Sequence, residues 1–100
     1  MATLEELRAD IDRVDAVIVR LLNERARFVC EIGRVKQLDG AAVYQPDREK
    51  RVIDHVRSIA AEGPLGPDAI ARLFERIIEE ARQLEQRVVH GADGVASGSV

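Results

Sequence analysis

Charged side chains occupy positions where the helical spacing of this sequence calls for apolar ones. Arg25 lies on an apolar seam, Lys36 lies beside that seam, and Glu85 falls on the apolar stripe of another helical segment. Arg48 and Glu49 open a third segment, on the sector that its apolar residues occupy. Burying an unpaired ion costs several kcal/mol, so these groups need an ionic partner, a water-filled cavity or a ligand.

Two interpretations of these charges are open. Arg25 can pair internally with Glu49 or Glu85, and a lone polar residue on a seam often only fixes the register of the helices. Alternatively, the basic groups bind an anionic ligand, which is favoured because they outnumber the buried acids. A guanidinium matches a carboxylate with two parallel hydrogen bonds, so the pattern indicates a small dicarboxylate.

The remaining reactive residues form no recognisable catalytic or metal-binding set. Cys30 has no histidine near it in the pattern, and His55 and His90 are far apart in the sequence. There is no Ser-His-Asp arrangement and no zinc-ligand spacing. We therefore expect no metal and no cofactor, and we expect any catalysis to proceed by positioning and electrostatics alone.

The composition excludes several classes of partner. A chain of 100 residues suits one domain, and 33% charged residues are typical of a soluble globular protein. The aromatic content is only 3% and the net charge is −3, which disfavours a nucleic-acid partner. No apolar run is long enough to span a membrane, and the acidic N-terminus is unlike a signal peptide. We expect a cytoplasmic protein that binds neither nucleic acid nor membranes.

Three helices must position the charged groups, because no segment shows the two-residue alternation of a strand. Thr3 followed by Glu6 is a capping-box pattern that starts the first helix, and Gly40 ends it. We predict one all-α domain over residues 1–90 and a disordered tail over 91–100, where small residues leave no apolar face. The expected helices cover residues 4–38, 47–61 and 68–88.

The first helix carries a heptad seam, in which apolar residues recur at alternating steps of three and four. At about 1.5 Å per residue this helix is roughly 50 Å long, whereas a compact globule of about 100 residues is roughly 35 Å across. Two shorter helices cannot cover both ends of the seam, so we expect a homodimer with interleaved long helices. The seam consists of Leu4, Leu7, Ile11, Val14, Ile18, Leu21, Arg25, Phe28, Ile32 and Val35.

Three segments of the sequence resemble the all-helical chorismate mutases. They are LRADIDRVDAVIVRLLNERARFVCEIGRVK, VYQPDREKRVI and LFERIIEEARQLE, and the resemblance runs from about residue 4 to residue 87. It implies an isomerase that rearranges chorismate to prephenate, in the shikimate route to phenylalanine and tyrosine. It also implies an intertwined dimer of three-helix chains, in which each of two active sites takes one arginine from the partner subunit.

The resemblance assigns roles to four cations. Arg8 resembles the arginine that reaches the partner's site, and Arg25 resembles the arginine that acts within its own chain, both binding substrate carboxylates. Lys36 resembles the lysine that donates to the ether oxygen and to a carboxylate. Arg48 resembles the arginine at a helix start that supports the pocket.

Four further positions complete the site that the resemblance implies. Glu49 resembles the carboxylate that accepts a hydrogen bond from the substrate hydroxyl, and Glu85 resembles the second donor to the ether oxygen. Gln45 stands where Asp is common and where the backbone N–H is thought to contribute, so we expect this replacement to matter little. Ala81 departs from the family, since many members carry a small hydroxyl there, and its loss can weaken binding or indicate a related substrate.

The implied reaction is a pericyclic shift, in which one C–O bond breaks as a C–C bond forms. Arg8 and Arg25 would hold the compact conformer of the substrate. Lys36 and Glu85 would stabilise the negative charge that grows on the ether oxygen. A carboxyl group donates only when protonated, so we expect activity to fall as Glu85 loses its proton at higher pH, and Glu85→Gln to flatten that fall.

Two enzymes on the same scaffold are alternatives: an isochorismate-pyruvate lyase, and a mutase acting on 4-amino-4-deoxychorismate. The Pro-Asp-Arg-Glu helix start and the loop at Tyr44 favour the plain mutase. We expect no fused dehydratase, dehydrogenase or synthase domain in a chain of this length. An alternative of another class is a non-catalytic helical dimerisation module, in which Arg25 and Arg48 are neutralised internally and no anion pocket forms.

Overall fold

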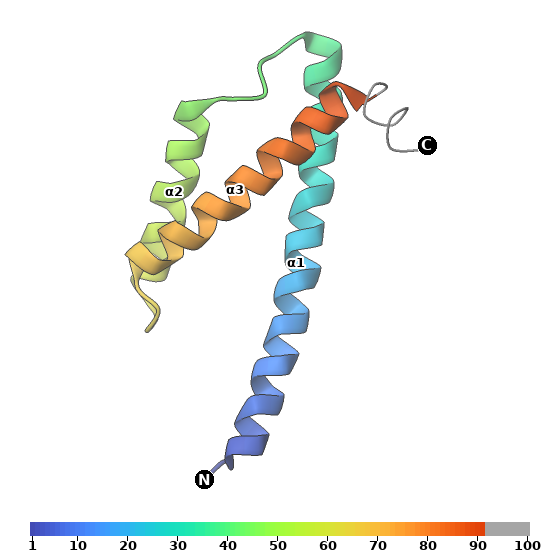
Figure 1. Cartoon of the computed structure of the whole chain (residues 1–100). Helices are drawn as coiled ribbons and strands as arrows, with labels where there is room; N and C mark the ends of the chain where they lie inside the picture. The colour runs from blue at the N-terminus through green and yellow to red at the C-terminus, as the bar shows by residue number, and fades with distance from the viewer. Residues whose placement is uncertain (92–100) are drawn as a thin grey trace.

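The computed structural model describes residues 1–91 and consists of three helices, with no strand in that range. They are α1 (Leu4–Asp39), α2 (Pro46–Ala60) and α3 (Pro67–Val89), as Figure 1 shows. The predicted all-α class and the three helices are confirmed, with each end within one residue of its expected position. Apart from Gly91, the tail predicted over 91–100 lies outside the described residues.

Local sequence chemistry fixes both ends of α1. The Thr3 hydroxyl accepts from the Glu6 backbone N–H, and the Glu6 carboxylate accepts from the Thr3 backbone N–H, which is the predicted capping box. The hydrogen bond from the Thr3 backbone N–H lowers the pKa of the Glu6 carboxyl group, and the Thr3 side chain lowers it further. At the other end Gly40 takes the left-handed conformation, with φ of 72°, and its N–H donates to the Lys36 carbonyl.

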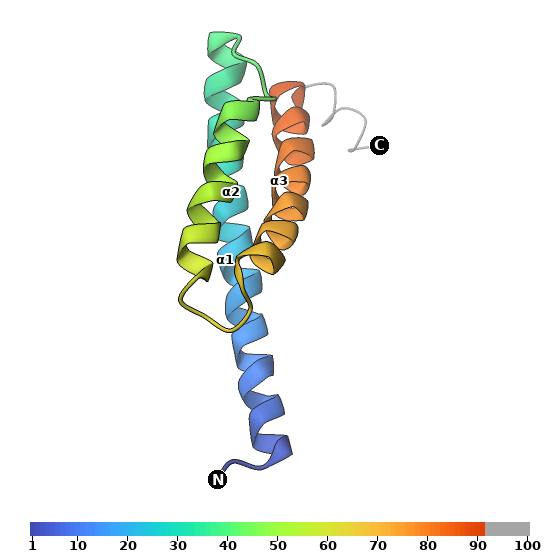
Figure 2. The same ribbon diagram turned by 90° about the vertical axis from the view of Figure 1, so that its left-hand side faces the viewer.

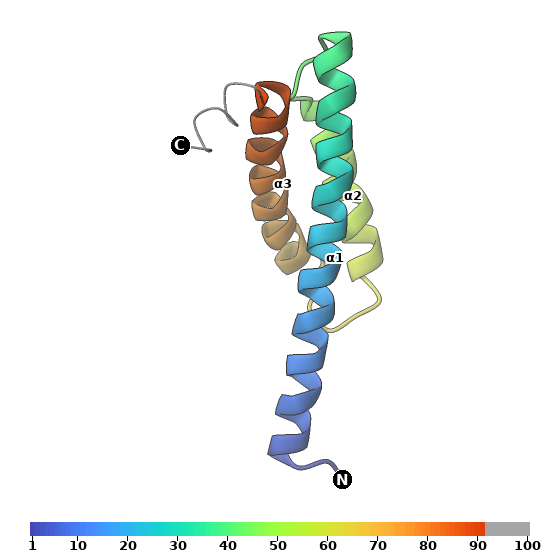
Figure 3. The same cartoon turned by 90° about the vertical axis from the view of Figure 1, so that its right-hand side faces the viewer.

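Helix α1 is as long as the whole molecule. Its 36 residues span about 54 Å at about 1.5 Å per residue, and the longest dimension of the chain is 55 Å. The radius of gyration is 17.1 Å, whereas a compact chain of this size has about 13 Å. Figures 1 and 3 show that the N-terminal part of α1 extends well beyond α2 and α3.

Helix α3 joins the fold together, because it packs against α1 on one side and against α2 on the other. Figure 2 shows α2 and α3 side by side over the C-terminal half of α1. The core they make is small, and it contains no large side chain that is completely buried. Its buried residues are Val29, Gly33, Val56, Ala71, Ile78 and Glu85.

Most of the predicted seam is uncovered in the single chain. Ile11 is 59% exposed and Phe28 is 58% exposed, although both lie in the middle of the apolar pattern. Ile59 and Leu73, which lie on the apolar stripes of α2 and α3, are also more than half exposed. The fold of one chain therefore leaves an apolar stripe along α1 that two short helices do not cover.

Gly33 lies at the closest approach of α1 and α3. A Cβ atom there would stand 2.9 Å from Cγ1 of Val88 and 3.4 Å from the Glu85 carbonyl oxygen. We predict that Gly33→Ala destabilises the fold by about 1–2 kcal/mol, because overpacking of about 1–3 kcal/mol exceeds the gain in helix propensity of about 1 kcal/mol. Urea unfolding measures the difference, and equal or higher stability of the variant would contradict the packing described.

Candidate active site

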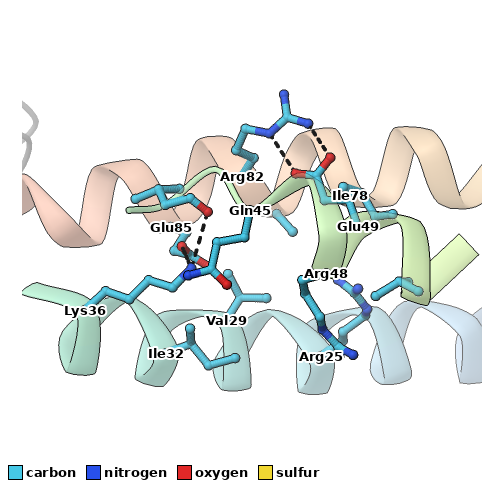
Figure 4. A pocket seen from close by; sticks show the side chains of 13 residues that line it. Arg25, Val29, Ile32, Lys36, Gln45, Arg48, Glu49, Ile78, Arg82 and Glu85 are labelled. Atoms are coloured by element: carbon cyan, nitrogen blue, oxygen red, sulfur yellow. Dashed lines mark hydrogen bonds and ion pairs between the residues drawn. The ribbon is translucent and has the colours of Figure 1, made fainter. Parts of the chain in front are cut away.

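A cavity of about 290 Å³ lies between the three helices (Figure 4). Helix α1 contributes one wall, α3 contributes another, and the start of α2 with the preceding loop closes the third side. Seven of the eight residues predicted to form the site line this cavity, and Arg8 does not. The charged and polar lining residues are Arg25, Lys36, Gln45, Arg48, Glu49, Arg82 and Glu85.

Lys36 and Glu85 form an ion pair at one end of the cavity. The Lys36 Nζ atom donates to Glu85 Oε2 at 2.7 Å and to the Val43 carbonyl oxygen at 3.3 Å. The two side chains are only 15% and 12% exposed, so the pair is well shielded from water. An ammonium group has three N–H donors, which leaves one of them for a ligand in the cavity.

Glu49 forms a bidentate ion pair with Arg82 across α2 and α3. Arg82 Nη2 donates to Glu49 Oε1 at 2.7 Å, and Arg82 Nε donates to Oε2 at 3.1 Å (Figure 4). The same guanidinium lies 4.9 Å from the centre of the Tyr44 ring. Its hydrogen bonds to Glu49 raise the pKa of Arg82.

Sequence reasoning missed Arg82. The signal that could have found it is its spacing, because Arg82 precedes Glu85 by three residues and therefore lies on the same face of α3. This spacing alone does not mark Arg82 as functional, because a charge at the edge of an apolar stripe usually belongs to a solvated face.

Arg25 and Arg48 face the other end of the cavity without a carboxylate. Within residues 1–91 neither guanidinium has an acidic side chain at salt-bridge distance, because Glu85 pairs with Lys36 and Glu49 pairs with Arg82. Burial lowers the pKa of Arg25, and the positive charge of Arg48 lowers it further. The interpretation of internal pairing between Arg25 and either glutamate is wrong for this structure.

The charges of the cavity therefore match a dianion. Four cations and two carboxylates line it, and the two ion pairs use all the carboxylates. The guanidiniums of Arg25 and Arg48 lie together, and Arg25 is half-buried. An anion with two carboxylates bound there would neutralise both charges. Figure 4 shows them at the end of the cavity opposite Lys36.

The sequence model of the family "Chorismate mutase type II" matches residues 7–86. The chain belongs to this family. A bifunctional chorismate mutase/prephenate dehydratase of Neisseria gonorrhoeae is 40% identical over 88 residues, which are 84% of this chain and 24% of the relative. The corresponding bifunctional protein of Aquifex aeolicus is 33% identical over 88% of this chain and 25% of its own length.

Another relative has a length comparable to that of this chain. The chorismate mutase of Methanocaldococcus jannaschii is 27% identical over 84% of this chain and 85% of the relative. By contrast, the chain spans about a quarter of the length of the bifunctional relatives it matches.

Two predicted positions of the candidate site have no charge. Gln45 is the residue before α2, and its side-chain amide donates to the Ala42 carbonyl oxygen at 3.3 Å instead of capping the helix. Ala81 lines the cavity with a methyl group alone, so the departure from the family that the sequence indicated lies within the site.

Arg8 is exposed near the start of α1. It precedes Arg25 by 17 residues, which is about 25 Å along the helix axis, and it does not line the cavity. No rearrangement of an intact α1 can bring Arg8 into the site of its own chain.

Neither a metal-binding group nor a membrane-spanning helix is found among residues 1–91. They hold no group of three or more His, Cys, Asp or Glu side chains that could bind a metal ion. Nor does any of their helices have an apolar stretch of the length that crossing a membrane requires.

Proposed function

We propose that this chain catalyses the rearrangement of chorismate to prephenate. The observation that carries the proposal is the pair of uncompensated guanidiniums, Arg25 and Arg48, at one end of a cavity whose other end holds Lys36. Chorismate has two carboxylates and an ether oxygen, which are the groups that such a cavity would bind. Membership in the chorismate mutase type II family supports the same reaction.

Binding in the compact conformer accounts for part of the proposed catalysis. The reaction is intramolecular. A substrate that is bound with its reacting carbons in contact has therefore already lost most of the conformational entropy that reaching the transition state would cost. Arg25 binds one carboxylate, Arg8 of the partner subunit binds the other, and Arg48 supports the pocket from the start of α2. Glu49 accepts a hydrogen bond from the substrate hydroxyl.

Electrostatic stabilisation of the ether oxygen accounts for the rest. As the C–O bond breaks, negative charge grows on that oxygen, and the remaining N–H of Lys36 donates to it. Glu85 orients Lys36 when it is ionised and donates to the same oxygen when it is protonated. No proton transfer, metal or cofactor enters these steps, and residues 1–90 form the catalytic domain of a cytoplasmic enzyme.

The proposed enzyme is an intertwined homodimer. Support comes from the exposed apolar seam of α1 and from Arg8, which is too far along α1 to reach the cavity of its own chain. An antiparallel or crossed arrangement of two α1 helices would bury both seams and bring each Arg8 toward the partner's cavity.

Incubation with chorismate and, separately, with isochorismate tests the proposed function. The expected result is loss of chorismate with formation of prephenate, and little turnover of isochorismate. Formation of pyruvate and salicylate from isochorismate with no reaction of chorismate would establish the lyase alternative instead. No turnover of either compound would leave the 4-amino-4-deoxychorismate mutase and the non-catalytic module, and incubation with 4-amino-4-deoxychorismate distinguishes these two.

The pH profile tests the role of Glu85. A carboxyl group donates to the ether oxygen only when it is protonated, so we predict that kcat of the wild type falls with rising pH. Glu85→Gln, which donates at every pH, is expected to flatten this fall. An unchanged profile in the variant would remove the donor role and leave Glu85 as the residue that orients Lys36.

A further inference from the structure

We propose that Arg82 is a positioning residue that prepares Glu49 for a neutral hydroxyl group and thereby makes the site select chorismate over its 4-amino analogue. This inference rests on the proposed function, in which Glu49 contacts the ring substituent of the substrate. Arg82 is not among the site residues predicted from the sequence. Its pairing with Glu49 gives a reason why the site would select between two substrates of almost identical shape.

The geometry holds Arg82 firmly against Glu49. Two parallel hydrogen bonds of 2.7 and 3.1 Å join the guanidinium to the carboxylate. A third N–H of Arg82 donates to Glu79 Oε2 at 3.2 Å, and the Tyr44 ring covers the guanidinium at 4.9 Å. Contacts from three directions therefore fix the orientation of Arg82, and Arg82 in turn fixes the orientation of Glu49.

Glu49 keeps its ability to accept a hydrogen bond in this pair. A carboxylate has about four acceptor positions, and Arg82 uses one on each oxygen. Glu49 also lines the cavity, so a substrate hydroxyl can use a remaining position. Arg82 offsets the negative charge of Glu49, because its guanidinium lies directly against that carboxylate. Glu79, the other carboxylate that contacts Arg82, is 43% exposed and does not line the cavity.

This neutralisation distinguishes two substituents of similar size. A hydroxyl group is neutral and needs only an acceptor, whereas an aliphatic amine is largely protonated near neutral pH and gains most from a free negative charge. With Glu49 paired to Arg82 and Glu85 paired to Lys36, an ammonium group would meet the uncompensated positive charges of Arg25 and Arg48 and no free carboxylate of the cavity. The paired site therefore favours the hydroxyl compound.

The test compares kcat/KM for chorismate and for 4-amino-4-deoxychorismate in the wild type and in Arg82→Gln. Arg57→Gln is the matched control, since Arg57 also joins α2 to α3, through Asp68, but does not line the cavity. Arg82→Lys keeps the charge and loses the bidentate geometry. Where the amino compound is not turned over, its inhibition constant against chorismate replaces kcat/KM.

We expect Arg82→Gln to lower kcat/KM for chorismate about tenfold and to raise the ratio of amino to hydroxyl substrate about tenfold. The Arg82 and Glu49 side chains are 31% and 26% exposed, and solvent screening limits the change to this size. The ratio in Arg82→Lys is expected to lie between the ratios in the wild type and in Arg82→Gln. Arg57→Gln is expected to leave the ratio unchanged.

An unchanged ratio in Arg82→Gln, with chorismate activity comparable to that of Arg57→Gln, would overturn the inference and leave the proposed function standing. A wild type that prefers the amino compound would overturn it as well. A wild type that acts on neither compound would instead refute the proposed function, and the inference with it. If Arg82→Gln does not fold, the ratio measured in Arg82→Lys decides, because that variant keeps the interhelical charge pair.

Discussion

Lys36→Met is expected to lower kcat by about 10²–10³-fold, with a much smaller effect on substrate binding. Glu85 and the Val43 carbonyl oxygen hold Lys36 at the end of the cavity opposite Arg25 and Arg48. The remaining N–H of Lys36 is the donor proposed for the ether oxygen. Loss of one such donor costs about 2.7–4 kcal/mol in the transition state. Single-turnover measurements with chorismate separate this loss from any change in binding.

A stability effect accompanies this substitution and must be separated from it. Without Lys36 the Glu85 carboxylate, 12% exposed, loses its partner at 2.7 Å, which costs about 1–3 kcal/mol of folding stability. The double variant Lys36→Met, Glu85→Gln removes the unpaired charge, so we expect it to regain stability without regaining activity. Recovery of activity together with stability would show that Lys36 supports the fold and does not act on the substrate.

Ile18→Asp is expected to abolish the proposed dimer and the activity together. Ile18 lies in the middle of the α1 seam and is 47% exposed in the single chain. In the proposed dimer a charge there is buried without a partner, at a cost of about 3–5 kcal/mol, and the two-fold symmetry applies the change twice. We expect at least about a 10³-fold weaker dimer, and activity falls with it because Arg8 no longer reaches a partner's site.

Val19→Asp is the matched control for this prediction. Val19 is next to Ile18 on the same helix, it is 57% exposed, and it lies outside the seam. The same charge there is expected to leave both assembly and activity close to wild type. Sedimentation equilibrium gives the assembly state, and a fully active monomer of Ile18→Asp would contradict the shared active site.

The helices could be predicted because their signals are local. The Thr3 and Glu6 capping box, the Gly40 turn and the prolines that begin α2 and α3 act within one or two turns of the chain. The uncovered seam could be predicted as well, since it depends on helix length and on apolar spacing along α1. Seven cavity residues followed from apolar stripes interrupted by charge and from the family pattern.

The pairing of the charges could not be predicted, because it depends on how the helices cross. From the sequence Arg25 is the candidate partner of Glu85, and only the crossing of α1 and α3 places Lys36 there instead. The spacing along α3 places Arg82 on the face of Glu85, but its pairing cannot be read from that helix, since its partner Glu49 is 33 residues away. The exposed Ile59 and Leu73 show the same limit, because apolar spacing does not tell which partner covers a face.

The central claim, a site shared between two subunits, is tested most directly by mixing two inactive variants. Arg8→Ala removes the residue proposed to come from the partner, and Lys36→Met removes a residue of the cavity itself. A mixed dimer of these chains has one intact site if Arg8 acts across the interface, so coexpression should restore about a quarter of the wild-type activity. The control pair, Arg25→Ala with Lys36→Met, should restore none, because both residues belong to the same cavity. Activity in the first mixture alone is the predicted result, and no recovery in that mixture, despite mixed dimers, would contradict the account.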